Sequence, residues 1–173
     1  MRFFSGFSLQ GDRHFFEPYL KKSDYTVAGF SYGAIKAAHF AAESTDRIDT
    51  LQLFSPAFFQ TKKESFKRLQ MGGYLKDPDG YLEAFLANCF APCPMQAVEE
   101  GEHNADALHE LLYFEWDGML MERIRSKGTR IEVYLGLEDR IIDVVGAREF
   151  FIPYATVTSI KRANHFLQEC TQQ

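Results

Sequence analysis

The sequence predicts an α/β fold: about five mainly parallel strands with helices on both faces, and a small helical cap inserted between the third and fourth strands. Short β-rich apolar runs alternate with helix-forming segments at both ends of the chain, a pattern typical of a parallel sheet with covered faces. The middle of the chain is instead amphipathic and helical, with glycine- and proline-containing breaks. We therefore expect a core formed by residues 1–59 and 128–173 and a helical cap formed by residues 60–127.

The expected elements follow from the composition of each segment. The strand-like segments are residues 3–5, 24–30, 48–59, 129–139 and 156–162. The clearest helix is 32–44, because it is rich in alanine and repeats its apolar residues at helical spacing. The other expected helices of the core are residues 12–22, interrupted at Pro18, then 144–154 and a last short one at 164–170. We expect a right-handed crossover from the first strand to its neighbour.

The bulk composition excludes several classes of protein. A chain of 173 residues with 46% hydrophobic residues is suited to one globular domain. Its net charge of −5 argues against nucleic acid as a partner, and no apolar run approaches the roughly 18 residues of a membrane span. The cysteines, Cys89, Cys93 and Cys170, match neither a disulfide framework nor a zinc pattern. We expect reduced thiols, no metal, no cofactor and, without a secretory signal, a cytoplasmic location.

Three reactive side chains come just after three of the expected strands. In α/β sheets the ligand crevice lies at the carboxyl ends of the strands, and Ser31, Asp139 and His165 occupy such positions in this order. Ser31 lies in "GFSYG", which matches the G-x-S-x-G pattern of a nucleophile on a sharp strand-to-helix turn. The alternative for Ser31 is a helix cap, a role that serine favours.

The roles of the other two side chains follow from the chemistry of a serine nucleophile. His165 would take the proton from Ser31 and return it to the leaving alcohol. Asp139 would orient the imidazole and stabilise its charged form. Glu138 and Asp143 are competing carboxylates, although strand alternation should point Glu138 to the other face and Asp143 lies a turn further on.

An oxyanion hole needs two backbone donors close to the nucleophile. One would be the N–H of Tyr32, which follows Ser31, and the other the N–H of Phe7, in the turn after the first strand. An ordinary glycine turn is the alternative for the second.

These stretches resemble the α/β-hydrolase family, and most of all the compact bacterial carboxylesterases that remove the methyl group from pimeloyl-acyl-carrier-protein methyl ester in biotin synthesis. Residues 5–8, "SGFS", are similar to the family's "H-G-W-G" oxyanion turn, with Ser5 in place of the histidine. The acid and histidine motifs are matched by Gly136, Asp139, Ile141, Ile142, His165 and Phe166. The resemblance implies a reduced hydrolase fold without the strands beyond the oxyanion strand, a Ser-His-Asp triad and an acyl-carrier protein as partner.

Such an esterase needs a narrow apolar slot beside Ser31 and a surface for its acidic carrier. The residues expected to bind the substrate are Phe7, Tyr32, Phe58, Tyr81, Phe85 and Trp116. The residues expected to dock the carrier are Lys62, Lys63, Lys67 and Arg68, and a solvated helix face is an equal alternative.

Two other functions stay open. The same triad could serve a broader short-chain acyl esterase or a thioesterase. The fold could also form a binding module without catalysis, against which the intact Ser, Asp and His series argues.

Overall fold

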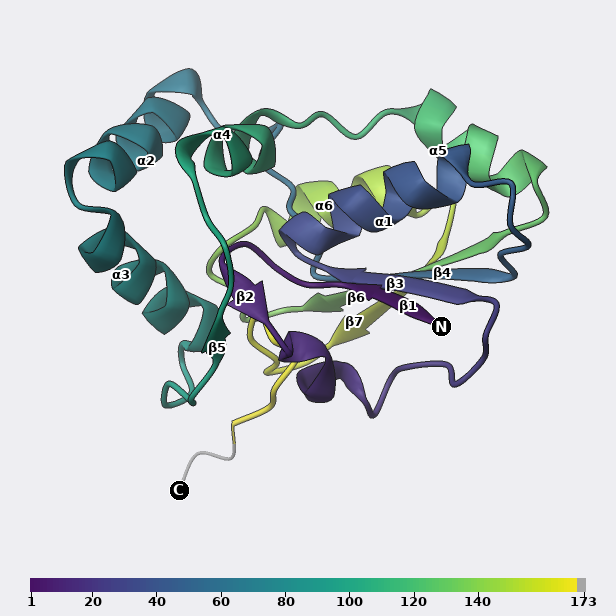
Figure 1. Ribbon diagram of the computed structural model, residues 1–173, viewed down its shortest axis with the longest axis horizontal. Coiled ribbons are helices and arrows are strands. Elements are labelled where there is room, and N and C mark those ends of the chain that lie inside the picture. The colour runs from purple at the N-terminus through teal and green to yellow at the C-terminus, as the bar shows by residue number, and fades with distance from the viewer. Residues whose placement is uncertain (171–173) are drawn as a thin grey trace.

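The computed structural model describes residues 1–170, and its centre is one sheet of five parallel strands (Figure 1). In their order across the sheet, the strands are β1 (Arg2–Phe4), β3 (Thr26–Phe30), β4 (Thr50–Phe54), β6 (Arg130–Gly136) and β7 (Thr156–Ile160). The predicted α/β class and the five parallel strands are confirmed.

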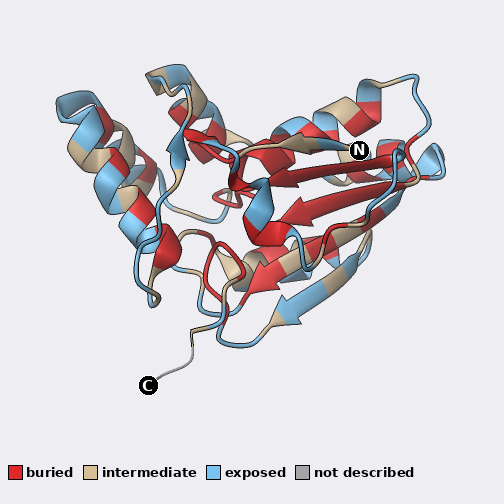
Figure 2. Ribbon diagram, turned by 60° about the horizontal axis from the view of Figure 1, so that its bottom comes forward, coloured by how far each residue is buried: buried red, intermediate tan, exposed pale blue. Residues whose placement is uncertain are grey.

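The register brings the carboxyl ends of the strands to one level. Phe30 of β3 is aligned with Phe54 of β4, which is in turn aligned with Tyr134 of β6. Every residue of β3 and β4 is buried, whereas β7 at the edge of the sheet is partly exposed (Figure 2). Residues that follow these aligned strands therefore meet at one edge of the sheet.

α-Helices cover one face of the sheet, and a short 3-10 helix lies on the other. One face carries α1 (Tyr32–Glu43), α5 (Gly118–Ser126) and α6 (Val144–Phe151), with α5 lying against α1 (Figure 1). The other carries η1 (Asp12–Phe16), a short 3-10 helix whose Phe16 ring stacks on Phe54 at 4.8 Å. The predicted helix over 12–22 thus ends at Phe16, close to Pro18, which has no N–H to continue it.

The connection from β1 to β3 differs from the expected right-handed crossover. It runs with η1 beneath the sheet, whereas α1 connects β3 to β4 above it, and both connections lead to the next strand in the same direction. Because they lie on opposite faces, the two connections have opposite hands, and the one from β1 to β3 is left-handed. The rule describes helical crossovers packing back on a twisted sheet, and here a 3-10 turn and an extended segment replace the helix.

Three helices of the segment 60–127 lie beyond the carboxyl ends of the strands: α2 (Glu64–Lys76), α3 (Pro78–Phe90) and α4 (Ala105–Tyr113) (Figure 1). Asp77 caps α3 by accepting a hydrogen bond from the N–H of Gly80 at 3.1 Å. A two-stranded antiparallel ribbon of β2 (Leu9–Gln10) and β5 (Glu99–Glu100) connects this segment to the start of the chain. The division into core and cap stays a prediction, and α5, inside the predicted cap, packs on the core helix α1.

The chain after β7 forms a tight loop where a last helix over 164–170 was predicted. Ala163 pairs with Glu169 in an isolated antiparallel bridge, and Leu167 has a positive φ of 58°. The side chain of Asn164 accepts a hydrogen bond from the N–H of Gln168 at 3.0 Å. These local hydrogen bonds compete with helix formation. Within residues 1–170, no helix combines the length and the apolar character needed to cross a membrane.

Candidate active site

Ser31 occupies a strained turn between β3 and α1. Its φ of 52° and ψ of −114° lie in a region that side chains rarely adopt, and its N–H donates to the carbonyl of Phe54 at 2.9 Å. The side chain makes no capping hydrogen bond to α1. Ser31 is therefore not a side-chain cap, and its hydroxyl is directed elsewhere.

The two glycines of the "GFSYG" turn are required by close approaches of the backbone. A Cβ at Gly29 would overlap the carbonyl group of Gly33, and a Cβ at Gly33 would overlap the carbonyl oxygens of Phe4 and Ser5. The turn thus brings β1, β3 and the start of α1 closer together than any side chain would allow.

Ser31, His165 and Asp139 form one hydrogen-bonded chain. The Nε2 atom of His165 lies 2.9 Å from Oγ of Ser31, and its Nδ1 atom lies 2.6 Å from Oδ2 of Asp139. The side chains of His165 and Asp139 are fully buried, and Ser31 is 2% exposed. Oδ1 of Asp139 accepts hydrogen bonds from the N–H groups of Ile141 and Ile142, at 2.7 and 3.3 Å, so its second oxygen is held toward the imidazole.

The two competing carboxylates, Glu138 and Asp143, lie away from His165. Glu138 is exposed. Asp143 caps α6 through the N–H of Gly146 at 3.1 Å and accepts a hydrogen bond from the hydroxyl of Thr61 at 2.7 Å. These hydrogen bonds hold the pKa of Asp143 below its usual range. Of the three acidic side chains, only Asp139 contacts His165.

The turn after β1 is held by a buried carboxylate. The N–H of Gly6 donates to Oδ2 of Asp12 at 2.8 Å, and Asp12 is 1% exposed, so burial raises the pKa of this carboxyl. The next residue, Phe7, is buried and packs its ring edge-on against Tyr32 at 6.4 Å. Tyr32 is the first residue of α1, and its N–H has no acceptor within the helix. The predicted oxyanion donors, Phe7 and Tyr32, are thus neighbours, and their role stays a prediction.

Comparison with known proteins adds to this geometry. No family model matches the chain, and no curated protein matches it. Among solved structures, MenH from S. aureus matches with a TM-score of 0.60 and 15% identity over 94% of this chain and 85% of that chain. BioG from Haemophilus influenzae matches with a TM-score of 0.56 and 12% identity over 95% and 87%.

The fold is that of the α/β-hydrolases. A carboxylesterase of the thaumarchaeon Nitrososphaera gargenis has the same fold, with a TM-score of 0.51 and 16% identity. The match covers 82% of this chain but only 57% of that esterase. The protein is thus a reduced version of the α/β-hydrolase fold, with five strands in its main sheet.

Beside the site of this hydrolase fold is a pocket of about 430 Å³ between α2, α3 and α4. Two of the predicted substrate residues, Tyr81 and Phe85, line it. Phe85 packs edge-on against Phe7 at 6.0 Å, and Ile141, also in the lining, donates its N–H to Asp139. The pocket therefore adjoins the Ser31–His165–Asp139 chain, although Ser31 and His165 do not line it.

Two other predicted substrate residues, Phe58 and Trp116, pack in the hydrophobic core. Phe58 is 1% exposed and packs against Phe150 and Phe151 of α6. Trp116 is 2% exposed, packs on Phe151 at 5.0 Å and donates its Nε1–H to the carbonyl of Ala57 at 2.8 Å. Both belong to the core between the sheet and α6.

The predicted docking residues surround the start of α2 and are not equally accessible. Lys67 is 7% exposed, with its Nζ over the ring of Tyr113 at 4.9 Å, so it is not available to a partner. Arg68 is exposed and pairs with Glu64 at 2.9 Å. Lys63 is exposed and Lys62 half-buried.

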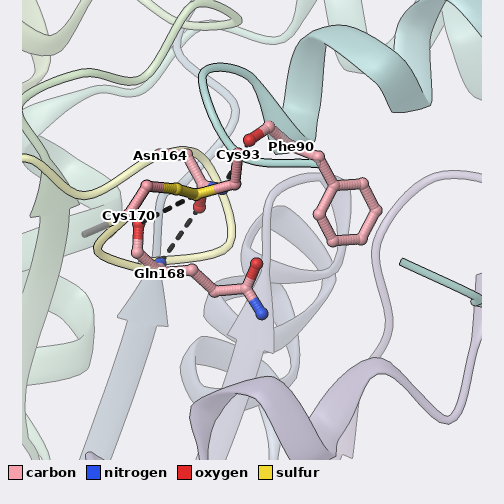
Figure 3. The surroundings of a disulfide bond; sticks show 5 residues. All are labelled: Phe90, Cys93, Asn164, Gln168 and Cys170. Carbon is pink, nitrogen blue, oxygen red and sulfur yellow. Dashed lines mark hydrogen bonds between the residues drawn. A yellow bond between two sulfur atoms is a disulfide. The ribbon is translucent and has the colours of Figure 1, made fainter. Parts of the chain in front are cut away.

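The expectation of three reduced thiols is wrong for two of them. Cys93, after α3, forms a disulfide with Cys170, which follows the His165 loop, with a Cα–Cα distance of 5.6 Å (Figure 3). Cys89 is free and buried, and burial raises the pKa of its thiol. The 77-residue separation of the paired cysteines offered no local signal. In the described chain, residues 1–170, no group of three or more His, Cys, Asp or Glu side chains could hold a metal ion.

Proposed function

We propose that this protein is a serine carboxylesterase. The observation that carries the proposal is the buried chain from Oγ of Ser31 through the imidazole of His165 to Asp139, with distances of 2.9 and 2.6 Å. A serine in a strained strand-to-helix turn, a base within hydrogen-bonding distance and an acid that orients the base are the parts of nucleophilic acyl transfer.

The reaction follows from these positions. His165 takes the hydroxyl proton of Ser31 as Oγ attacks the ester carbonyl, and Asp139 stabilises the imidazolium. The N–H groups of Phe7 and Tyr32 bind the oxyanion of the tetrahedral intermediate. The proton then passes to the leaving alcohol, and a water molecule activated by His165 hydrolyses the acyl-enzyme.

The substrate that we propose is the methyl ester of pimeloyl-acyl-carrier protein, with methanol as the leaving alcohol and biotin synthesis as the pathway. The motif resemblance supports it, and the match of BioG over 95% of this chain and 87% of that chain supports the shared fold. Because all matched structures named above are at most 16% identical, they support the fold, and the substrate rests on the resemblance. A short-chain esterase or thioesterase with the same triad is the second candidate.

The decisive experiment is complementation of a biotin auxotroph that lacks its methyl esterase. We expect the wild type to restore growth and Ser31→Ala to fail, with both proteins present at equal levels. Growth with Ser31→Ala would contradict the mechanism. No growth with a wild type that hydrolyses p-nitrophenyl acetate would favour the broader esterase.

The proposed partner is the acidic acyl-carrier protein, and the exposed cations at the start of α2 are its proposed docking surface. Lys63 and Arg68 are accessible there, next to the exposed Leu69. Reversing both charges, with Lys63→Glu and Arg68→Glu, should lower kcat/KM for a carrier-bound ester and leave that for p-nitrophenyl acetate unchanged. The matched control is Lys22→Glu, an exposed lysine in the segment that leads into β3. Equal losses on both esters would contradict the docking surface.

A further inference from the structure

Asn164, directly before His165, is fully buried and uses both ends of its amide. Its Nδ2 donates to the carbonyl of Phe90 at 2.7 Å, and its Oδ1 accepts from the N–H of Gln168 at 3.0 Å. Its own N–H donates to the carbonyl of Gln168, also at 3.0 Å. Figure 3 shows Asn164 between the end of α3 and the loop that follows His165.

Phe90 holds both neighbours of His165. Its carbonyl, at the end of α3, accepts hydrogen bonds from the N–H of Cys93 at 2.8 Å and from the side chain of Asn164 at 2.7 Å. Its ring stacks on the ring of Phe166 with centroids 4.3 Å apart. Residues 164 and 166 are thus both attached to one residue of α3, and the imidazole between them has little freedom to move.

The disulfide joins the same two segments, the end of α3 and the His165 loop, at the far end of the loop. Cys93 lies three residues after Phe90, and its partner Cys170 lies five residues after His165. The loop around His165 is therefore joined to the end of α3 at two places, once by a buried amide and once by a covalent bond (Figure 3).

We propose that Asn164 is a positioning residue for His165, which sets the imidazole against Ser31 by tying its loop to the carbonyl of Phe90. The inference rests on the proposed function, since it assigns the position of the general base. A misplacement of a catalytic group by about 1 Å can cost roughly 100-fold in rate. Without the amide, the N–H of Gln168 loses its acceptor and the carbonyl of Phe90 loses one of its two donors. The loop then loses its hydrogen bond to α3.

The test compares Asn164→Ala with Gln52→Ala. Gln52 is also a fully buried amide, which accepts from the N–H of Lys21 and donates to the carbonyl of Tyr19, each at 3.0 Å, but it lies in the middle of β4. The measurements are the rate of Ser31 labelling by a fluorophosphonate and kcat and KM for p-nitrophenyl acetate. Asn164→Ala should label about 100-fold more slowly and lower kcat with little change in KM. Gln52→Ala should stay within about twofold of the wild type, although both lose stability.

The outcomes separate this inference from the proposed function. A wild type that no fluorophosphonate labels would contradict the serine esterase. A reactive wild type with an equally reactive Asn164→Ala would contradict only the positioning role. Should Asn164→Ala not fold, Asn164→Asp retains the acceptor for Gln168 and loses the donor to Phe90, so full reactivity of this variant would overturn the role of the Phe90 carbonyl.

Discussion

The Ser31 turn and the His165 loop hold two members of one hydrogen-bonded chain by different means. The Ser31 turn is held by its own backbone: two glycines at close approaches, a positive φ and a hydrogen bond to the neighbouring strand. The His165 loop has one isolated bridge of its own and is attached by side chains to α3, more than 70 residues earlier in the chain.

This difference explains how a reduced fold can keep Ser31, His165 and Asp139 in one hydrogen-bonded chain. A turn enforced by backbone sterics needs only the strands on either side of it, and β1 and β4 supply them. The His165 loop needs a second element against which to pack, and α3 serves here. The segment beyond the strand ends therefore contributes both to the position of His165 and to the pocket lined by Tyr81 and Phe85.

The largest expected effect tests whether the two regions act as one chain. Asp139→Asn should lower kcat by on the order of 10⁴-fold, because an amide favours the wrong tautomer of the imidazole. Its oxygen can still accept from the N–H groups of Ile141 and Ile142, so the melting temperature should change little. The measurement is kcat for p-nitrophenyl acetate together with thermal unfolding. Glu138→Gln, at an exposed neighbour, is the control, and an equal loss of kcat there would contradict the choice of Asp139.

A second prediction tests the backbone origin of the Ser31 turn. Gly33→Ala should lower the free energy of unfolding by about 3 kcal/mol or more, since the added Cβ overlaps two carbonyl oxygens that cannot move independently. Gly72→Ala, within α2, is the matched control, because its Cβ would have nothing within 4 Å. The control should gain about 0.5–1 kcal/mol. Both are measured by urea unfolding, and equal stability of the two variants would show that the close approach at Gly33 is not needed.

The sequence predicts the parts of this molecule that depend on local patterns. Alternating strands and helices indicate the sheet, and the order of residues after strand ends predicts that Ser31, Asp139 and His165 meet. The glycine pattern around Ser31 is a local steric requirement, which a short motif can record.

The parts that depend on distant contacts could not be predicted. The contact between Asn164 and Phe90 joins residues 74 positions apart, and nothing in either segment signals the other. Aromatic side chains fill cores and pockets alike, so Trp116 and Tyr81 look equivalent in sequence, and only packing separates them. The hand of the β1–β3 connection depends on which face η1 covers, which its composition does not reveal.

A third prediction concerns the attachment of the His165 loop. Cys93→Ser should lower the free energy of unfolding by about 2–4 kcal/mol, because the disulfide closes a long loop in the unfolded chain. The measurement is urea unfolding with and without dithiothreitol. The reductant should bring the wild type to the stability of the variant and leave the variant unchanged, since its remaining cysteines, Cys89 and Cys170, are unpaired. Equal stabilities without reductant would contradict the disulfide.

The smallest expected effect tests whether Asp143, near Asp139 in the sequence, stabilises the fold as the cap of α6, as its contacts indicate. Asp143→Ala removes the cap of α6 and should cost about 1 kcal/mol at pH 7. The hydrogen bonds from Thr61 and Gly146 hold the pKa of Asp143 below its usual range. Its stabilising contribution is therefore complete above the unfolded-state pKa of about 3.9 and is lost as the pH falls through the lower folded-state value. Urea unfolding of the wild type and of Asp143→Ala should show a difference that is constant from pH 7 to 5 and shrinks below pH 4. A difference that grew on acidification would mean that this carboxyl is stabilised in its protonated form, and the assignment of Asp143 to the helix cap would be wrong.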